Sequence, residues 1–260
     1  MGEKWSNPPV FYTLAQVRFN PIVQMEEYVP ELQDRLRHIG YPDYQQEQKI
    51  EVAIRKPASE QPDVRPQQLI RWSFTNIDRT EAYTLHPDAL IFHSTQYVNF
   101  EDFSEKVLRG LSLAHEVIEL AYVQRIGLRY LDAVVPANND LLDNYLNPSL
   151  LGLSGAAPGQ LTHSFTETVS QVNGGTLVAR AVITEDGLAM PPDLFPMTLK
   201  LPDRLGQLSG RIAVLDTDYF VEQRKIFDLN SVKEQLLVSH KIVGDAFKSS
   251  ITEHAVSAWR

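Results

Sequence analysis

The chain has 260 residues, of which 43% are hydrophobic and 22% charged, values typical of a globular protein with a sizeable core. Its formal net charge of −9 argues against non-specific binding of nucleic acid or of an anionic membrane over the whole surface. The absence of cysteine excludes disulfides, a thiol nucleophile and cysteine–zinc sites, and suits a reducing cytoplasm. The sequence has neither a long apolar run nor the apolar core of a signal peptide, so we expect a cytoplasmic protein without a membrane span.

The first half of the chain predicts a β-α-β4-α unit. Residues of the first strand are β-branched or aromatic, and the two helices carry apolar residues at helical spacing. A loop rich in proline and glutamine, Pro57–Gln68, separates the second strand from a three-stranded meander. In chain order, the expected strand, helix, four strands and helix are Val10–Phe19, Met25–Ile39, Lys49–Lys56, Leu69–Thr75, Glu81–Leu85, Ala89–Tyr97 and Glu101–Tyr122.

The second half predicts the same order of elements. These are, again in chain order, Arg125–Val135, Asp140–Leu151, Leu161–Val172, Thr176–Thr184, Pro196–Leu201, Arg211–Phe220 and Asn230–Ile251. Short colinear matches favour an internal duplication. They pair Val17-Arg18-Phe19 with Leu128-Arg129-Tyr130, Ile70-Arg71-Trp72 with Ala179-Arg180-Ala181, and Thr95-Gln96-Tyr97 with Thr217-Asp218-Tyr219.

We therefore predict an α+β fold made of two pseudo-repeated β-α-β4-α halves, residues 8–122 and 123–260, which could form one continuous domain. Their strands should form a curved antiparallel sheet with the long helices on one face. The helix stripes should face that sheet and bury large apolar side chains, namely Trp72, Phe74, Phe103, Leu111, Leu236 and Phe247. The alternative is a single irregular α+β domain whose halves share only strand-like composition.

This order of elements resembles the TATA-binding-protein-like architecture, in which two such units share one curved sheet. It is also similar to the helix-grip fold, in which a ligand binds between a long helix and a sheet. Three features resemble a sporadically distributed family of uncharacterised microbial proteins of about this length: Asn7-Pro8-Pro9, the strand Arg125–Tyr130, and the ending from Phe247 to Trp259. That resemblance implies no activity. A patchy distribution suggests a phage-defence or toxin–antitoxin setting.

Four arginines lie inside predicted strands at matching places in the two halves: Arg18, Arg71, Arg129 and Arg180. Strand alternation points each of them away from its apolar neighbours, so we expect all four on the face turned away from the helices. Guanidinium groups gathered there would bind phosphate or carboxylate groups through paired hydrogen bonds. We expect them to converge on one surface, with at least two lacking a close carboxylate. The alternative is that each pairs with an acid on a neighbouring strand, such as Glu51, Glu81 or Glu167.

Other polar residues give weaker indications. Asp216 and Asp218 lie two residues apart in one strand and could hold a metal ion for phosphoryl or nuclease chemistry, although they could equally lie at a solvated strand end. His115 and His240 occupy matching helix positions but lack the short ligand spacing of a metal site. No phosphate-binding loop, dinucleotide fingerprint or nucleophile elbow occurs. We predict no catalytic residue, no resident metal and no cofactor.

The favoured function is a non-enzymatic binding protein that uses the four arginines to hold an anionic small molecule, an acidic protein partner or nucleic acid. One alternative is a metal-dependent nuclease or phosphohydrolase that uses Asp216 and Asp218. Another is a structural scaffold or homo-oligomer, which a large exposed apolar patch would favour.

Overall fold

The computed structural model describes residues 7–55, 63–137 and 140–260, with only the backbone described over 49–55 and 63–69. Its strands are β1 Val10–Phe19, β2 Asp43–Arg55, β3 Asp63–Thr75, β4 Glu81–His86, β5 Ala89–Ser94, β6 Tyr122–Val134, β7 His163–Val172, β8 Gly175–Glu185 and β9 Arg211–Ile226. Its α-helices are α1 Met25–His38, α2 Phe100–Ile118, α3 Pro148–Leu151, α4 Leu229–Ser250 and α5 Glu253–Trp259. Short 3-10 turns are η1 Leu142–Asn144, η2 Pro192–Leu194 and η3 Asp203–Leu205.

All these strands join one antiparallel sheet in the order β2-β3-β4-β5-β1-β6-β9-β8-β7, which confirms the α+β class. The first strand of each predicted half lies in the middle, because β1 pairs with β6. Each of these central strands also pairs with the last strand of its own half, β1 with β5 and β6 with β9. The predicted halves are therefore continuous through one sheet.

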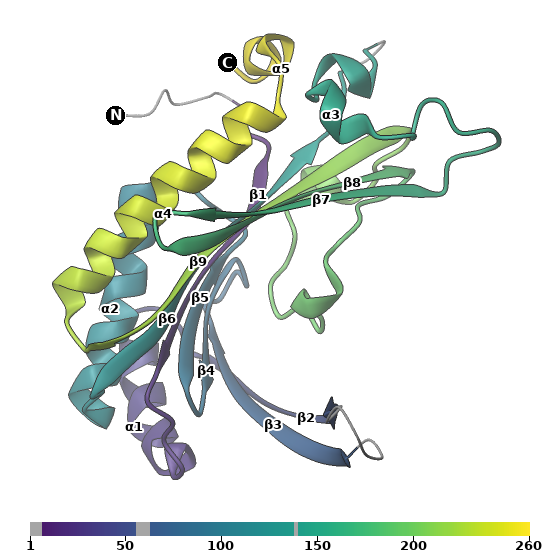
Figure 1. The fold of residues 1–260 in the computed structure, drawn as a ribbon. Coiled ribbons are helices and arrows are strands. Elements are labelled where there is room, and N and C mark those ends of the chain that lie inside the picture. The colour runs from purple at the N-terminus through teal and green to yellow at the C-terminus, as the bar shows by residue number, and fades with distance from the viewer. Residues whose placement is uncertain (1–6, 56–62, 138–139) are drawn as a thin grey trace.

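The long helices α1, α2 and α4 lie together against one face of the curved sheet (Figure 1). Their apolar stripes bury a large core with the inward side chains of the strands, including Phe19, Phe74 and Leu128. The other face, called here the helix-free face, carries no long helix from the described residues (Figure 1). The β8–β9 connection, residues 186–210, folds across part of it (Figure 1). Five of the six side chains expected in the core are buried, whereas Phe247 is only partly buried against a smaller cluster around Trp259.

The strand predicted over Pro196–Leu201 does not form. Its alternating apolar residues Met197, Leu199 and Leu201 pack instead on the helix-free face, against a cluster that includes Phe11 and Leu131. A proline at each side, Pro196 and Pro202, removes backbone donors that a ladder would need. The alternating apolar residues thus arise because this segment packs on the face of the sheet, and not because it is one of its strands.

Other boundaries differ from those predicted. The expected loop Pro57–Gln68 is partly strand, since β3 begins at Asp63. Helix α2 ends at Ile118 because Glu119 adopts a left-handed conformation with φ 57°, after which the chain enters β6. The helix expected over Asp140–Leu151 is divided into η1 and α3.

The sequence matches that suggested a duplication do not coincide in register. Arg129 lies opposite Asp218, within the matched segment Thr217–Tyr219, but Arg18 lies opposite Ala89, and the counterpart Thr95–Tyr97 follows the end of β5. Moreover β8 pairs directly with the last strand of its half, whereas β4 separates β3 from β5. Arg71 and Arg180 therefore hold different places in the sheet, and the duplication stays a prediction.

Candidate functional site

Strand alternation places all four predicted arginines on the helix-free face. Their neighbours Val17, Trp72 and Leu128 are buried under the helices, so the side chains between them point the other way. Arg71 and Arg129 line one pocket on this face, which Arg18 and Arg180 do not reach. The pocket thus brings together two of the four residues, whereas Arg129 and Arg180 meet at Asp216.

The expectation that at least two of these arginines lack a carboxylate is wrong. Arg18 donates to Asp88 across 2.6 Å, and Arg71 donates to Glu47 on the neighbouring strand across 2.5 Å. Arg180 donates to Glu167, its cross-strand neighbour, across 2.7 Å. Cross-strand pairing therefore accounts for much of the arginine placement, as the alternative interpretation stated. Glu81 bonds instead to Lys106 and Tyr41, and the side chain of Glu51 lies outside the described residues.

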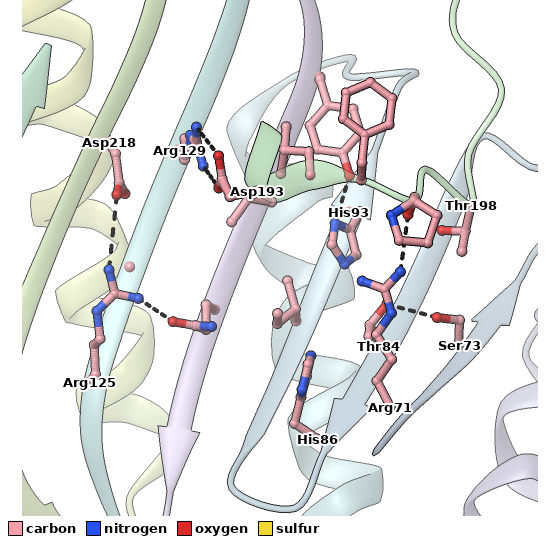
Figure 2. Close-up of a pocket in the computed structure, with 18 residues that line it drawn as sticks. Arg71, Ser73, Thr84, His86, His93, Arg125, Arg129, Asp193, Thr198 and Asp218 are labelled. Carbon is pink, nitrogen blue, oxygen red and sulfur yellow. Dashed lines mark hydrogen bonds and ion pairs between the residues drawn. The ribbon is translucent and has the colours of Figure 1, made fainter. Parts of the chain in front are cut away.

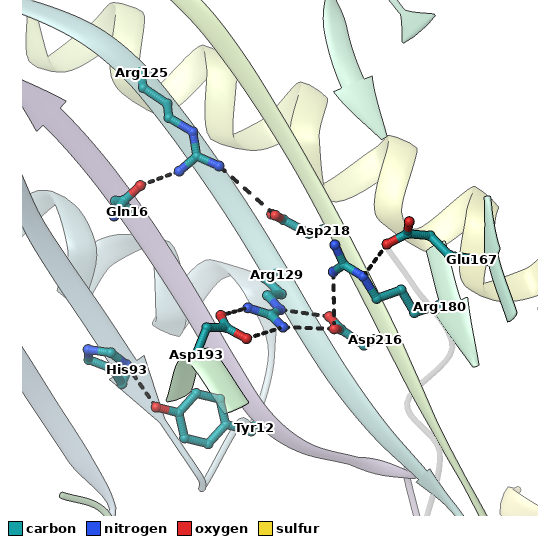
Figure 3. Close-up of polar contacts among 10 residues, drawn as sticks. All are labelled: Tyr12, Gln16, His93, Arg125, Arg129, Glu167, Arg180, Asp193, Asp216 and Asp218. Carbon is teal, nitrogen blue, oxygen red and sulfur yellow. Dashed lines mark hydrogen bonds and ion pairs between the residues drawn. The ribbon is translucent and has the colours of Figure 1, made fainter. Parts of the chain in front are cut away.

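The fourth arginine, Arg129, belongs to a closed ion-pair network that we call the Asp216 cluster: Arg129, Arg180, Asp193 and Asp216 (Figure 3). Asp216, 2% exposed, accepts from Nε and Nη2 of Arg129 at 2.6 and 2.7 Å, and from Arg180 at 3.3 Å. Burial by itself lowers the pKa of Arg129, but hydrogen bonds to Asp216 and Asp193 outweigh it and raise that pKa above its usual value. These contacts place Asp216 at the centre of a structural network of ion pairs.

This arrangement disfavours the alternative in which Asp216 and Asp218 hold a metal ion. Both carboxylate oxygens of Asp216 accept hydrogen bonds from guanidinium groups, which would compete with a cation for the same lone pairs. Across residues 7–55, 63–137 and 140–260, no group of three or more acids and histidines has the geometry to hold a metal ion.

The pocket has a volume of about 340 Å³ and spans the helix-free face from β3 to β9 (Figure 2). Its floor is formed by outward side chains of β3, β4, β5, β1, β6 and β9, and its roof by part of the β8–β9 connection, Asp193–Thr198. Two arginines of the floor hold this roof: Arg129 donates to Asp193 across 2.5 Å, and Arg71 donates to the carbonyl of Pro196 across 3.1 Å.

At the β3 end of the pocket lie Arg71, His86 and His93 (Figure 2). Arg71 uses Nε and Nη2 for Glu47 and Pro196, while its Nη1 has no hydrogen-bond partner within the described part of the chain. The Nδ1 atom of His93 shares a hydrogen bond of 2.8 Å with the Tyr12 hydroxyl. Its Nε2 is buried and has no hydrogen-bond partner among the residues that the structure describes. This end therefore holds two nitrogens whose hydrogen bonding is incomplete.

The two histidines at this end are held neutral. Burial, then the Arg71 charge, lowers the pKa of His93 to about 3. The same causes, in the same order, lower the pKa of His86. Since a nearby positive charge and burial both disfavour imidazolium, a bound anion would oppose part of this effect.

At the β9 end lie Arg125 and Asp218, which face each other across the β6–β9 pair (Figure 2). Arg125 donates through Nη1 to Gln16 and lies over the Phe220 ring, with its guanidinium carbon 4.2 Å from the centroid. Its nearest carboxylate oxygens, on Glu222 and Asp218, are 3.9 and 4.0 Å away, beyond hydrogen-bond distance. Arg125 and Asp218 are therefore both more loosely partnered than the Asp216 cluster.

Burial is the largest influence on the pKa of both residues. It lowers the pKa of Arg125, which Asp218 and Glu222 only partly offset. It raises the pKa of Asp218 despite the charges of Arg125 and Arg129. Each charge is thus held in a setting that favours a further partner of opposite sign or a hydrogen bond.

Sequence reasoning missed four residues that shape the pocket: Arg125, His86, His93 and Asp193. Arg125 could have been found, because it lies four residues before Arg129 in the same predicted strand and so on the same face. The side chains of His86 and His93 lie on the same face as that of Arg18. This could not be predicted without the β1–β5 and β4–β5 registers. Asp193 lies in a connection whose path no local pattern specifies.

The paired helix histidines have ordinary structural roles. His115 stacks on Phe227 with ring centroids 4.4 Å apart, and His240 stacks on Phe100 at 4.1 Å. His240 also contacts the Tyr130 hydroxyl through Nδ1 at 3.2 Å. Their partners are thus aromatic rings and a hydroxyl.

Comparison with models of known protein families finds no match to this chain, and comparison with curated proteins finds none either. In the described part of the chain, every helix is too short or too polar to cross a membrane.

Proposed function

We propose that this protein is a binding protein that holds a small anionic molecule in the pocket on its helix-free face. The observation that carries the proposal is the β3 end of the pocket. There, Nη1 of Arg71 and the buried Nε2 of His93 both lack a hydrogen-bond partner among the described residues. A buried polar atom without a partner is costly, and a ligand that supplies the missing acceptor removes that cost.

We take the Tyr12 hydroxyl to be the donor to Nδ1 of His93, an assignment that favours an acceptor on the ligand. When the Tyr12 hydroxyl donates to Nδ1, the proton of the neutral ring lies on Nε2, which then becomes a buried donor in a residue that lines the pocket. Together with Arg71 it forms a pair of donors beside a permanent positive charge. A carboxylate or phosphoryl oxygen satisfies both.

The dimensions favour a small molecule over nucleic acid. A volume of about 340 Å³ lies at the lower end of the range for small-molecule sites. The chain as a whole is acidic, and Arg18, Arg71, Arg129 and Arg180 each already bond a carboxylate, which leaves little net positive charge to attract a phosphate backbone.

Isothermal titration of the full chain with inorganic phosphate and with acetate tests the proposal. We expect saturable binding of at least one of these anions to the wild type. The variant Arg71→Ala should weaken it at least tenfold, because the variant loses the charge and the Nη1 donor.

A matched control is Arg18→Ala. Arg18 lies on the same face and bonds a carboxylate as Arg71 does, but it does not line the pocket. Binding that falls equally in both variants would assign the anion to the general charge of the face, and no binding of either anion by the wild type would refute the proposal. Binding only of an acidic protein or an oligonucleotide would point to the other partner classes.

A further inference from the structure

Resting on the proposed anion site, we infer that the ligand is elongated and that its far end carries a neutral group with a hydrogen-bond acceptor next to a donor. The chemical class that combines these features at this size is a nucleoside monophosphate whose base has a lactam edge, as in uracil or guanine. Its phosphate would lie at Arg71 and His93, and its base at Arg125 and Asp218.

The length of the pocket supports an elongated ligand. Arg71 on β3 and Arg125 on β6 are separated by β4, β5 and β1, so their backbones are four strand spacings, about 19 Å, apart. Both side chains reach inward from opposite sides of the same pocket (Figure 2). A simple anion touches one of these groups but cannot bridge them.

The β9 end presents a donor and an acceptor side by side. Nη2 of Arg125 and Oδ2 of Asp218 are 4.0 Å apart and form no hydrogen bond with each other. A guanidinium can only donate, and an ionised carboxylate can only accept. A ligand group with an oxygen acceptor beside an N–H donor could accept a hydrogen bond from Arg125 and donate one to Asp218 at the same time.

A lactam edge fits better than a second charged group. An added carboxylate would be repelled by Asp218, and an added ammonium group by Arg125, because both residues line the same end. A neutral edge is repelled by neither residue and can still form a hydrogen bond with each of them. The pairing of arginine with a base oxygen and of a carboxylate with a base N–H follows ordinary base-edge recognition.

The half-exposed ring of Phe195 adds an aromatic surface at the pocket roof. Nucleobases stack on such rings whatever their sequence identity. Phe220 lies under the Arg125 guanidinium and does not itself line the pocket. The roof of the pocket thus carries an aromatic ring, next to the Pro196 carbonyl that Arg71 holds.

The test is isothermal titration with inorganic phosphate, uridine 5′-monophosphate, guanosine 5′-monophosphate and N3-methyluridine 5′-monophosphate. We expect the uridine or guanosine nucleotide to bind the wild type at least tenfold more tightly than phosphate. N3-methylation, which removes the donor, should cost at least fivefold. In Asp218→Ala that penalty should disappear, while phosphate affinity stays within twofold of the wild type.

The exposed acid Asp245 on α4 supplies the matched control, and Asp245→Ala should retain the full nucleotide preference. Melting curves should show that both variants fold. Phosphate binding without any preference for either nucleotide would overturn this inference alone, as would a preference that survives in Asp218→Ala. Failure of phosphate, acetate and the nucleotides alike would refute the proposed anion site as well.

Discussion

Two groups of arginines on the same face of one sheet differ in how completely their hydrogen bonds are satisfied. In the Asp216 cluster, each of Nε, Nη1 and Nη2 of Arg129 has a carboxylate partner. In the pocket, Arg71 keeps an unbonded Nη1 as far as the structure is described, and Arg125 meets its nearest carboxylates only at 3.9 and 4.0 Å. We propose that this difference separates arginines that stabilise the fold from arginines that bind the ligand.

The contrast also shows why residue type alone misleads here. Arg129 and Arg71 were predicted for the same role, and both line the pocket. Only the bonding of the individual nitrogens distinguishes them. If the contrast is correct, changes in the Asp216 cluster should act on stability, and changes at the pocket ends should act on binding.

The largest effect should follow from removing the carboxylate at the centre of the cluster. Asp216→Ala leaves the guanidinium of Arg129 in a buried position without its main partner, and should cost about 3–5 kcal/mol of unfolding free energy. Urea denaturation at pH 7 measures it. The matched variant Asp193→Ala, at the exposed end of the same network with a side chain 62% exposed, should cost about 1 kcal/mol or less. If both variants lost the same free energy of unfolding, the claim that the buried centre of the network contributes most to stability would be wrong.

A second prediction compares the two arginines of β6 directly. Arg129→Met leaves Asp216 with only its longer contact to Arg180, and should cost about 2–4 kcal/mol. Arg125→Met removes a cation that is partly buried and loosely partnered, and keeps an apolar stem against Phe220, so stability should change by about 1 kcal/mol or less. The same urea experiment serves both, and a larger loss for Arg125→Met would reverse the assignment of the two groups.

Much of the fold could be predicted from local patterns, because the long helices carry clear apolar stripes. Helix α4 was expected over Asn230–Ile251 and is found at Leu229–Ser250. The prediction failed at Pro196–Leu201, where period-two alternation reports contact with a sheet face and not membership of the sheet. Local patterns carry no information about which surface an apolar side chain meets.

The candidate site was less predictable than the fold. Strand alternation correctly placed the arginines on one face, since side-chain parity is a local property. Their partners depend on how the strands pair: Arg71 bonds Glu47 on the preceding strand β2, whereas Arg129 bonds Asp216 on β9, which is far away in the sequence. The pocket itself depends on the path of the β8–β9 connection, which brings Asp193 and Phe195 over the sheet.

A third prediction uses the buried neutral histidines of the pocket. Because burial lowers the pKa of His93 to about 3, the folded state binds fewer protons than the unfolded state between about pH 6.5 and pH 3. Stability should therefore fall as the pH is lowered below 6.5, with His93 contributing about 2 kcal/mol by pH 5. Replacing His93 by Gln should flatten this part of the stability profile between pH 7 and pH 5. An unchanged slope would show that other groups dominate it.

The smallest expected effect links protons to the ligand, and it concerns the β3 end alone. Burial and the Arg71 charge lower the pKa of His86, so a bound anion beside Arg71 should raise it and binding should take up protons. The direction of the effect follows from this, since a complex that favours the protonated ring must become tighter as the pH falls.

Sulfate is the suitable probe because its charge stays constant over this range, and we expect about two- to fivefold tighter binding at pH 5.5 than at pH 7.5. In His86→Asn the dependence should shrink, whereas Asp245→Ala should keep it, because Asp245 is exposed on α4 and does not line the pocket. Sulfate affinity that weakens on acidification would place the anion away from the histidines, and so away from the end of the pocket on which the proposed function rests.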